Sequence, residues 1–220
     1  MLVTINAPPQ APAAFDGLNT AAQVPSLEFD YPKGTEIFGA SEPAQYIYQV
    51  IEGAVRSYQL LSHGRRQIGA FHLAGDGFGL EFDDVHRFSA EAVISTKLRL
   101  VKRQSVERSA QGDLVTMLSL LRMTSTSLRH AEDHLLLLGQ RTALERVANF
   151  LVEMEHRSAA AGVLALPMNR RDIADYLGLT LETVSRALTA LKQSGVIKFM
   201  GTQRDIVVTD TGRLAEIDLC

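Results

Sequence analysis

The stretch between Asn169 and Leu188 constrains the fold more than any other part of the chain, because it predicts two short helices joined by a tight turn. Asn169 can cap the first helix with its side-chain oxygen. Gly178 can end that helix, since glycine enters the left-handed conformation without steric cost. Thr180 can cap a second helix, whose buried face is predicted by apolar residues at helical spacing: Val184, Leu188 and Leu191.

Two strand-like segments follow the second helix. Residues 196–200 alternate like a strand, and residues 206–208 predict a second strand, with Lys198 and Arg204 on this hairpin. A helix-turn-helix followed by a hairpin is typical of a winged helix, a unit that places its second helix in a groove of DNA. An ordinary helical hairpin, in which Arg and Glu only keep the surface soluble, is the alternative interpretation.

The distribution of charge is compatible with such a contact. The 220 residues carry a formal net charge of −3, which argues against a uniformly basic, histone-like protein. Between residues 157 and 204, however, seven Lys and Arg residues stand against three Asp and Glu residues, a local charge of 7 − 3 = +4. A duplex responds to this local charge rather than to the net charge of the chain.

Cysteine usage and hydrophobic patterning indicate the cellular setting. Cys220 is the only cysteine of the sequence, which excludes disulfides and cysteine-ligated clusters within one chain. The N-terminus lacks the basic residues and long apolar core of a signal peptide, and no apolar run approaches the roughly 20 residues that span a bilayer. We therefore expect a cytoplasmic protein without a membrane partner.

The N-terminal half predicts a flexible arm over residues 1–25 and a domain of short strands over residues 26–109. Glu52–Gly53 and residues 62–64 are expected to form hairpin turns between these strands. Many short antiparallel strands at this spacing predict a β-barrel or jelly roll. Strand-like runs occur at residues 45–51, 54–60, 66–73, 90–95 and 97–101.

The pattern becomes helical after Ser105, and residues 110–139 predict a long helix with an apolar stripe. The stripe repeats at the a and d positions of successive heptads, which is typical of two helices packed side by side. We expect a homodimer through it, although packing on the chain's own barrel is an alternative. The predicted dimer interface is Leu114, Met117, Leu121, Thr124, Leu128, Ala131, Leu135 and Leu138.

A further helix is predicted over residues 142–157, and residues 140–220 complete a winged helix-turn-helix domain. The predicted fold class is therefore α+β. It comprises an N-terminal antiparallel β-barrel or jelly roll, a long dimerisation helix, and a C-terminal winged helix-turn-helix.

These segments together resemble the CRP/FNR superfamily of bacterial transcription regulators, and within it the FNR and FixK branches. The resemblance is strongest over residues 141–151 and 172–186, where Glu182, Ser185 and Arg186 form the Glu-x-x-Ser-Arg pattern of the FNR-like branch. The barrel fits through residues 48–56 and 75–79. The resemblance implies an effector-type barrel of the cyclic-nucleotide-binding kind and a winged helix that reads a palindrome with TTGA-like half-sites.

Residue chemistry agrees with those half-sites. Arg186 can bond guanine O6 and N7, and Glu182 can accept from cytosine N4. Leu181 can contact a thymine methyl group, and Ser185 can bond a base or pack near it. Contacts with the phosphate backbone are expected from Arg170, Thr180, Thr183, Lys198 and Arg204.

The resemblance also implies RNA polymerase as a protein partner. We expect the contact to involve loops of the barrel and the wing-side domain, with candidate surfaces near residues 63–66 and 82–87.

The sequence departs from the ligand-binding branches of the superfamily. Where the cyclic-nucleotide branch has a glutamate after the second glycine, Leu80 follows Gly79, and Glu81 comes one residue late, which reverses its facing in a strand. The iron–sulfur branch needs several N-terminal cysteines, which this sequence lacks. His130 and His134 have a spacing that suits zinc, but we interpret them as solvated helix residues. We expect no bound cofactor and no metal.

Our hypothesis is a FixK-type activator that binds its palindrome as a homodimer, without a cofactor. It would recruit RNA polymerase to genes for low-oxygen metabolism and nitrogen fixation. The alternative is a regulator of the same family gated by an unidentified small molecule in the barrel. We do not expect an enzyme, because the sequence offers no nucleophile–base pair or metal set at a plausible spacing.

Overall fold

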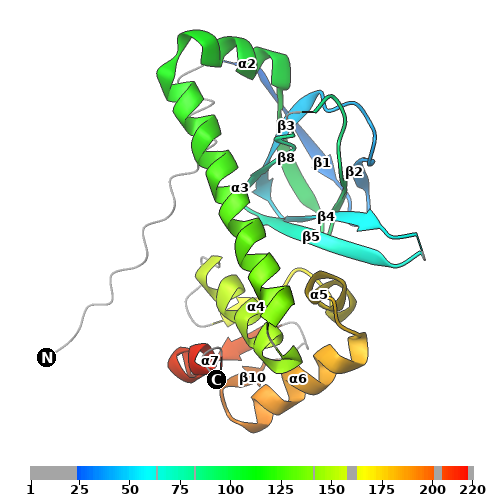
Figure 1. Cartoon of the computed structure of the whole chain (residues 1–220), viewed down its shortest axis with the longest axis vertical. Helices are drawn as coiled ribbons and strands as arrows, with labels where there is room; N and C mark the ends of the chain where they lie inside the picture. The colour runs from blue at the N-terminus through cyan, green and yellow to red at the C-terminus, as the bar shows by residue number, and fades with distance from the viewer. Residues whose placement is uncertain are drawn as a thin grey trace, which may run out of the picture.

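The computed structural model describes residues 24–62, 64–81, 83–140, 142–157, 163–200 and 205–217. A domain of β-sheets comes first, a long helix runs along its side, and a smaller domain of helices and short strands lies at the far end of that helix (Figure 1). This arrangement confirms the predicted α+β fold class. Most of the arm predicted over residues 1–25 lies outside the described residues, which begin at Val24.

The N-terminal domain consists of two four-stranded antiparallel sheets. Its strands are β1 (Ser26–Tyr31), β2 (Glu36–Phe38), β3 (Tyr46–Glu52), β4 (Ala54–Leu60), β5 (Arg66–Leu73), β6 (Gly77–Phe78), β7 (Ser89–Ala92) and β8 (Thr96–Lys102). One sheet has the order β1-β8-β3-β6 and the other the order β2-β7-β4-β5. Residues of both sheets, such as Val50, Val55 and Leu98, join one buried cluster. The predicted barrel or jelly roll is therefore confirmed.

The two turns predicted in this domain have different roles. The turn after Leu60 is a hairpin, because β4 and β5 pair with Leu60 opposite Arg66; His63 itself lies outside the described residues. The prediction of a hairpin at Glu52–Gly53 was wrong, since β3 and β4 belong to different sheets. Gly53 has φ = 93°, and a Cβ there would lie 2.5 Å from Thr96 Oγ1, so only glycine permits this crossing between sheets.

Two helices connect the sheets to the C-terminal domain. They are α2 (Arg103–Gly112) and α3 (Leu114–Gln140). The predicted helix over residues 110–139 starts too early, because Asp113 separates the two helices. The Asp113 carboxylate accepts hydrogen bonds from the backbone N–H groups of Val115 at 3.2 Å and Thr116 at 2.9 Å, which caps α3. Within the described ranges, no helix is both long and apolar enough to cross a bilayer.

The C-terminal domain has the elements of a winged helix. They are α4 (Ala143–Arg157), β9 (Val163–Ala165), α5 (Arg170–Leu177), α6 (Leu181–Gln193), β10 (Ile197–Phe199), β11 (Asp205–Val208) and α7 (Thr211–Glu216). The predicted helices and both wing strands are present. Sequence reasoning missed β9, which pairs with β11 and completes a small antiparallel sheet of order β10-β11-β9.

The hydrophobic core is continuous from the β-sheets into the C-terminal domain. Phe71 of β5 lies 5.2 Å from the Tyr176 ring of α5 and 6.3 Å from the Phe150 ring of α4, measured between ring centroids. Ile68 of β5 and Leu137 of α3 belong to the same buried cluster. The sheets, the long helix and the winged helix therefore pack around shared side chains.

We expect Phe150→Ala to lower the free energy of unfolding by about 3–5 kcal/mol, because it removes a fully buried ring and leaves a cavity between the domains. Equilibrium urea unfolding measures this change. Leu60→Ala, at a residue that is 72% exposed, serves as the control and should change stability by less than about 0.5 kcal/mol. Equal effects of the two substitutions would contradict the shared core.

Candidate nucleic-acid interface

The first helix of the predicted motif, α5, has a closed cap at each end. The Asn169 side chain accepts from the backbone N–H groups of Arg171 at 2.9 Å and Asp172 at 3.0 Å, and the Asp172 carboxylate accepts from the Asn169 N–H at 3.2 Å. This reciprocal arrangement is a capping box. Gly178 ends the helix at φ = 64°, in the left-handed region. Both predicted caps are confirmed.

The second helix, α6, is fixed by its own cap and buried face. The Thr180 hydroxyl accepts from the Thr183 N–H at 3.1 Å, and the two threonine hydroxyl groups lie 2.8 Å apart. The residues predicted for the buried face, Val184, Leu188 and Leu191, are buried together with Ala187. The opposite face of α6 is therefore held toward solvent.

Three of the four predicted base-reading residues lie on this solvent-exposed face. Leu181, Glu182 and Arg186 are exposed, and Arg186 Nη2 lies 2.5 Å from Glu182 Oε1. The two charged side chains are 80% and 72% exposed, so water screens their ion pair and it adds little stability. Arg186 and Glu182 thus lie one helical turn apart on the exposed face. Both side chains can leave their ion pair and hydrogen-bond to base edges instead.

The fourth residue, Ser185, is half-buried and contacts Arg170 of α5. Arg170 Nη1 donates to Ser185 Oγ at 3.3 Å, and the Arg170 guanidinium lies over the Phe199 ring of β10, 5.7 Å from its centroid. Lys192 Nζ lies 5.9 Å from the same centroid. Arg170 therefore bridges both helices of the motif and the wing. Sequence reasoning predicted Arg170 and Ser185 as DNA contacts but missed Phe199, because the contact joins residues far apart in the chain.

The remaining predicted backbone contacts surround α6. Lys198 is exposed on β10, and Thr180 and Thr183 stand at the start of α6. Arg204 lies outside the described residues. Arg171 is exposed in the first turn of α5 and was missed as a candidate, although its place beside the Asn169 cap was a readable signal.

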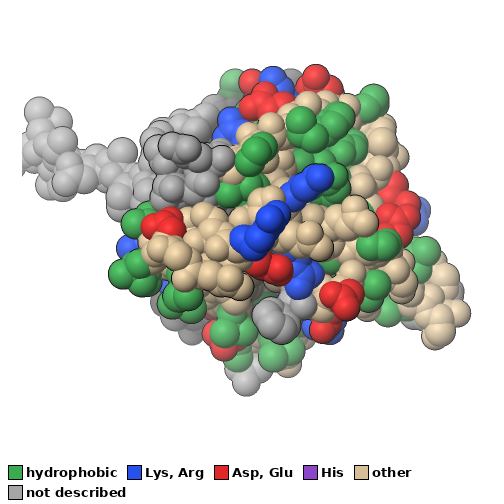
Figure 2. All heavy atoms as spheres, turned by 90° about the horizontal axis from the view of Figure 1, so that it is seen from above, with side chains coloured by type: hydrophobic (Ala, Val, Ile, Leu, Met, Phe, Trp, Pro, Cys, Tyr) green, Lys and Arg blue, Asp and Glu red, His purple; other side chains and the backbone are tan. Residues whose placement is uncertain are grey.

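The end of the molecule that carries α2 lies far from α6 (Figure 1). Figure 2 views the end that carries α2, and its acidic and basic side chains are interspersed with hydrophobic ones. Exposed Arg171, Arg186, Lys192 and Lys198 belong instead to the C-terminal domain. The geometry therefore favours the α6 face as the nucleic-acid interface.

The predicted dimer stripe lies on the face of α3 that the rest of the chain leaves uncovered. Leu121, Leu128 and Leu135 are 60%, 58% and 71% exposed. Leu114, Met117, Thr124 and Ala131 are also exposed, whereas Leu138 is half-buried and lies beside Gly178. The buried face of α3 is partly polar and includes Thr116, Ser119, Met123, His134 and Leu137. The helix thus buries several polar residues and exposes leucines.

The interpretation of His130 and His134 as solvated residues was wrong. His134 is buried, stacks on the Tyr176 ring at 4.1 Å, and its Nε2 lies 3.0 Å from the Tyr176 carbonyl oxygen. His130 Nε2 lies 3.0 Å from Glu153 Oε1, and this contact raises the pKa of His130. The described parts of the chain hold no group of three His, Cys, Asp or Glu residues arranged for a metal. Both histidines connect α3 to the C-terminal domain.

Aromatic and histidine rings stack within the barrel core. The His72 ring lies 4.7 Å from the Phe78 ring, and the Phe38 ring lies 3.6 Å from that of His86, again between centroids. Glu81 Oε2 lies 3.2 Å from Nδ1 of the buried His86. The carboxylate nearest in sequence to the cyclic-nucleotide glutamate is therefore engaged by another side chain of the barrel.

Two family models match the chain. A Crp-like helix-turn-helix domain matches residues 145–217, and a cyclic nucleotide-binding domain matches residues 28–113. The nitrogen fixation regulation protein FixK of Azorhizobium caulinodans is 42% identical over 193 residues, which cover 86% of this chain and 77% of that protein. The chain belongs to the CRP/FNR family of transcription regulators.

Other similar proteins place this CRP/FNR regulator close to FixK. The FixK protein of Rhizobium meliloti is 43% identical over 173 residues, which cover 79% of each chain. The solved structure of FixK2 from Bradyrhizobium japonicum is 59% identical, has a TM-score of 0.86, and is matched over 89% of this chain and 98% of that one. The resemblance inferred from residues 141–151 and 172–186 is thus confirmed.

Burial makes the stability of this regulator depend on pH. Desolvation lowers the pKa of His72 to about 4, from an ordinary value of 6.5. Between these values the unfolded chain binds a proton at His72 and the folded chain does not, so the free energy of unfolding should fall as the pH drops through this window. Urea unfolding measured from pH 7 to pH 4 should show a smaller loss for His72→Gln than for the unmodified protein. Identical losses would contradict this assignment.

Proposed function

We propose that this chain is a FixK-type activator that binds a palindromic DNA site with TTGA-like half-sites as a homodimer. The observation that carries the proposal is the exposed pair of Glu182 and Arg186 on the capped helix α6. The relatives named FixK, at 42% and 43% identity, support the same branch of the family. A regulator rather than an enzyme is the function that the fold and these relatives favour.

In the proposed complex, α6 lies in the major groove. Arg186 donates two hydrogen bonds to guanine O6 and N7, and Glu182 accepts from cytosine N4 on the opposite strand. Leu181, exposed at the start of α6, contacts a thymine methyl group. Ser185 is half-buried and is held by its hydrogen bond from Arg170. It contacts a base at the edge of the exposed face of α6. Specificity would arise mainly from the two charged side chains.

Contacts with the phosphates would position α6. Thr180 and Thr183 lie at the N-terminus of α6, where free N–H groups favour an anion. Arg170 beside α6 and Lys198 on the wing supply positive charge, and Arg204 would extend the wing contact. Arg171 joins this proposed set because it is exposed on the first turn of α5.

A second copy of the chain is the proposed partner of α3. The buried face of α3 already contacts the barrel of the same chain through residues such as Met123. The exposed leucines of α3 therefore require another apolar surface. A twofold dimer brings the same stripe from both chains together and presents two α6 helices to successive major grooves. Exposed Val115, Leu118 and Leu136 would widen the seam beyond the predicted heptad positions.

The domain division belongs to the same proposal. The arm over residues 1–25 precedes an effector-type barrel at 26–109, and the dimerisation helix precedes a DNA-binding domain at 140–220. The helix boundary is adjusted to Leu114, where α3 begins.

Activation without a bound cofactor is proposed because side chains of the barrel stack within its own core and Glu81 pairs with His86. The regulated genes would include genes for nitrogen fixation, because the FixK relatives are named nitrogen fixation regulation proteins. The proposal also includes genes for low-oxygen metabolism and places the regulator in the cytoplasm. RNA polymerase would bind the barrel near residues 82–87. In the other expected surface, residues 63–66, the Arg66 side chain is paired with Asp172 and Asp175.

The central test measures DNA binding by the purified protein with no added ligand. We expect tight, specific binding to the palindrome, and Arg186→Ala should weaken it by about 5- to 150-fold per half-site while leaving a weak, salt-sensitive attraction. Gel-shift titrations on the palindrome and on random DNA provide the comparison. Arg213→Ala, at an exposed arginine of α7, is the matched control. Equal losses on both DNAs, or binding that requires an added small molecule, would refute the proposal.

The dimer is tested by placing charge in the stripe. Leu128→Glu should convert the protein to a monomer, because two like charges would be buried at the seam, and binding to the full palindrome should fall with it. Sedimentation velocity reports the oligomeric state. Leu60→Glu introduces the same charge at an exposed leucine outside the stripe and should leave the dimer intact. A dimeric Leu128→Glu protein would show that the chains associate elsewhere.

A further inference from the structure

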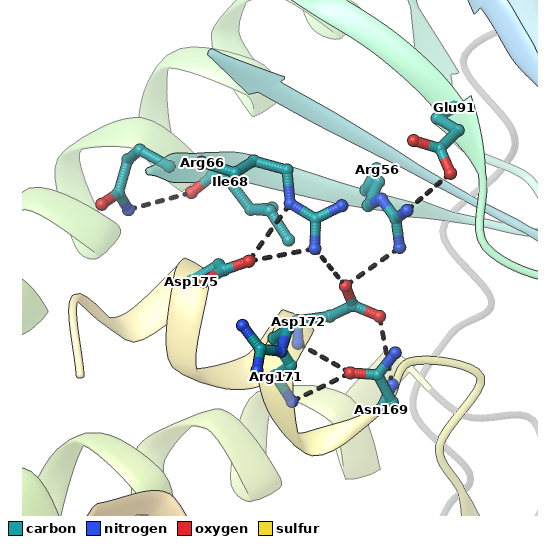
Figure 3. Close-up of polar contacts among 9 residues, drawn as sticks. Arg56, Arg66, Ile68, Glu91, Asn169, Arg171, Asp172 and Asp175 are labelled. Carbon is teal, nitrogen blue, oxygen red and sulfur yellow. Dashed lines mark hydrogen bonds and ion pairs between the residues drawn. The ribbon is translucent and has the colours of Figure 1, made fainter. Parts of the chain in front are cut away.

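A cluster of charged side chains joins the barrel to the first turn of the helix-turn-helix (Figure 3). Arg56 of β4 lies 2.9 Å from Asp172 of α5, between Nη1 and Oδ1, and Arg66 Nη2 of β5 lies 2.5 Å from the same oxygen. Arg66 also donates from Nε and Nη2 to Asp175 Oδ2, at 3.1 and 3.0 Å. Glu91 of β7 accepts from Arg56 Nη2 at 2.6 Å. We refer to Arg56, Arg66, Asp172 and Asp175 as the latch.

Asp172 is shared between the latch and the fold of the DNA-binding motif. Its Oδ2 accepts from the Asn169 N–H in the capping box, while its Oδ1 faces the two arginines of the barrel. The side chain is only 2% exposed. The turn that begins the helix-turn-helix is therefore connected directly to β4 and β5.

The latch restricts orientation more than ordinary apolar packing does. A carboxylate that is almost removed from water needs its counter-charges at hydrogen-bonding distance, because an unpaired buried charge is strongly unfavourable. The guanidinium forks have fixed geometry, and Arg66 is itself held over the Tyr58 ring, 5.5 Å from its centroid. Tilting α5 away from the barrel would break several directional contacts at once.

The other end of α5 is held independently. The Tyr176 carbonyl oxygen, in the last turn of the helix, accepts from Gln67 Nε2 of β5 at 3.3 Å and lies 3.0 Å from His134 Nε2 of α3. Carbonyl groups at a helix end lack partners within the helix, so these contacts satisfy a group that the helix cannot. With both ends attached to the barrel and α3, the helix has a defined tilt.

We propose that Arg56 and Arg66 are positioning residues for DNA binding, which set the orientation of α6 through Asp172 and Asp175. This inference rests on the proposed function, in which a dimer presents two α6 helices to one palindrome. Such helices must lie about 34 Å apart to enter successive major grooves. A regulator that acts without an effector needs this spacing built into its internal contacts, and the latch supplies such a contact. Preorganisation of this kind increases affinity by reducing the ordering required on binding.

The first experiment compares DNA sites that differ only in spacing. The full-length protein and an Arg56→Met/Arg66→Met variant are titrated against the palindrome and against versions with one or two base pairs added between the half-sites. The unmodified protein should discriminate strongly among these spacings. The variant should bind the natural palindrome at least tenfold more weakly and should discriminate much less, because its reading helices adopt a range of separations. Arg66→Lys, which retains the charge, should be intermediate.

The matched control is Arg99→Met. Arg99 is another half-buried arginine of the barrel, and it pairs with Glu28 and Gln49 at 3.1 Å each, in the sheet that does not carry the latch. It should retain both the affinity and the spacing preference. All titrations are made at a temperature well below the unfolding midpoint of each variant. A loss of stability alone then lowers the fraction of active protein without altering the ratio of its affinities for the different spacings.

A second measurement depends on neither DNA binding nor dimerisation. Spin labels at Lys33→Cys, in the exposed turn after β1, and at Gln193→Cys, at the exposed end of α6, report the distance between barrel and reading helix within one chain. Cys220→Ser removes the native thiol, and dilution with unlabelled protein suppresses distances between chains. The distance distribution should be narrow with the latch intact and broad in the Arg56→Met/Arg66→Met background.

The outcomes separate this inference from the proposed function. If the latch variant keeps a narrow distance distribution, or keeps the spacing preference of the unmodified protein, the positioning role is wrong. If the unmodified protein fails to bind a palindrome, the proposed function fails, while the intrachain distances still decide whether the latch orients α6.

Discussion

The carboxylate of Asp172 is the contact on which the relative placement of the two domains depends. It is nearly inaccessible to water, completes the capping box of α5, and meets two arginines from the barrel. A buried ion pair of this kind adds little net stability, because desolvation offsets much of the attraction. Its effect is directional. The apolar contact of Phe71 with Tyr176 holds the domains together, and the charges specify the angle at which they meet.

The long helix α3 buries several polar residues against its own chain and exposes leucines to solvent. On its buried face α3 carries Thr116 and Ser119, whose hydroxyl groups have partners close by in the chain: Ser119 Oγ donates to the Val115 carbonyl oxygen at 2.9 Å, and Thr116 Oγ1 donates to the Asp113 carboxylate. The leucines of the predicted dimer stripe are exposed, except for half-buried Leu138. This exposed apolar strip is the surface that the proposed dimer would bury against a second chain.

Local signals in the sequence predicted local structure well. The caps at Asn169, Gly178 and Thr180 are as expected, because a cap depends on residues within one turn of the helix. Predictions that required distant partners were less successful. The turn at Gly53 proved to be a crossing between sheets, since strand pairing is decided by the whole barrel.

The candidate site shows the same limit. The exposed face of α6 was predictable from helical spacing, but the contact of Arg170 with Phe199 was not. His130 and His134 were interpreted as solvated because helical spacing alone does not reveal that α4 and α5 pack against that face of α3. A side chain's environment depends on elements far along the chain, which a periodic pattern does not identify.

By itself, the sequence determined the family, the order of barrel, long helix and winged helix, and the face of α6 that carries Glu182 and Arg186. These features follow from periodicity and caps that act over a few residues. Only the tertiary structure decided that Arg56 and Arg66 meet Asp172, across separations of 116 and 106 residues. An arginine in a strand can pair with any carboxylate that the fold brings near. Its partner is therefore set by the packing of whole elements and not by its neighbours in the chain.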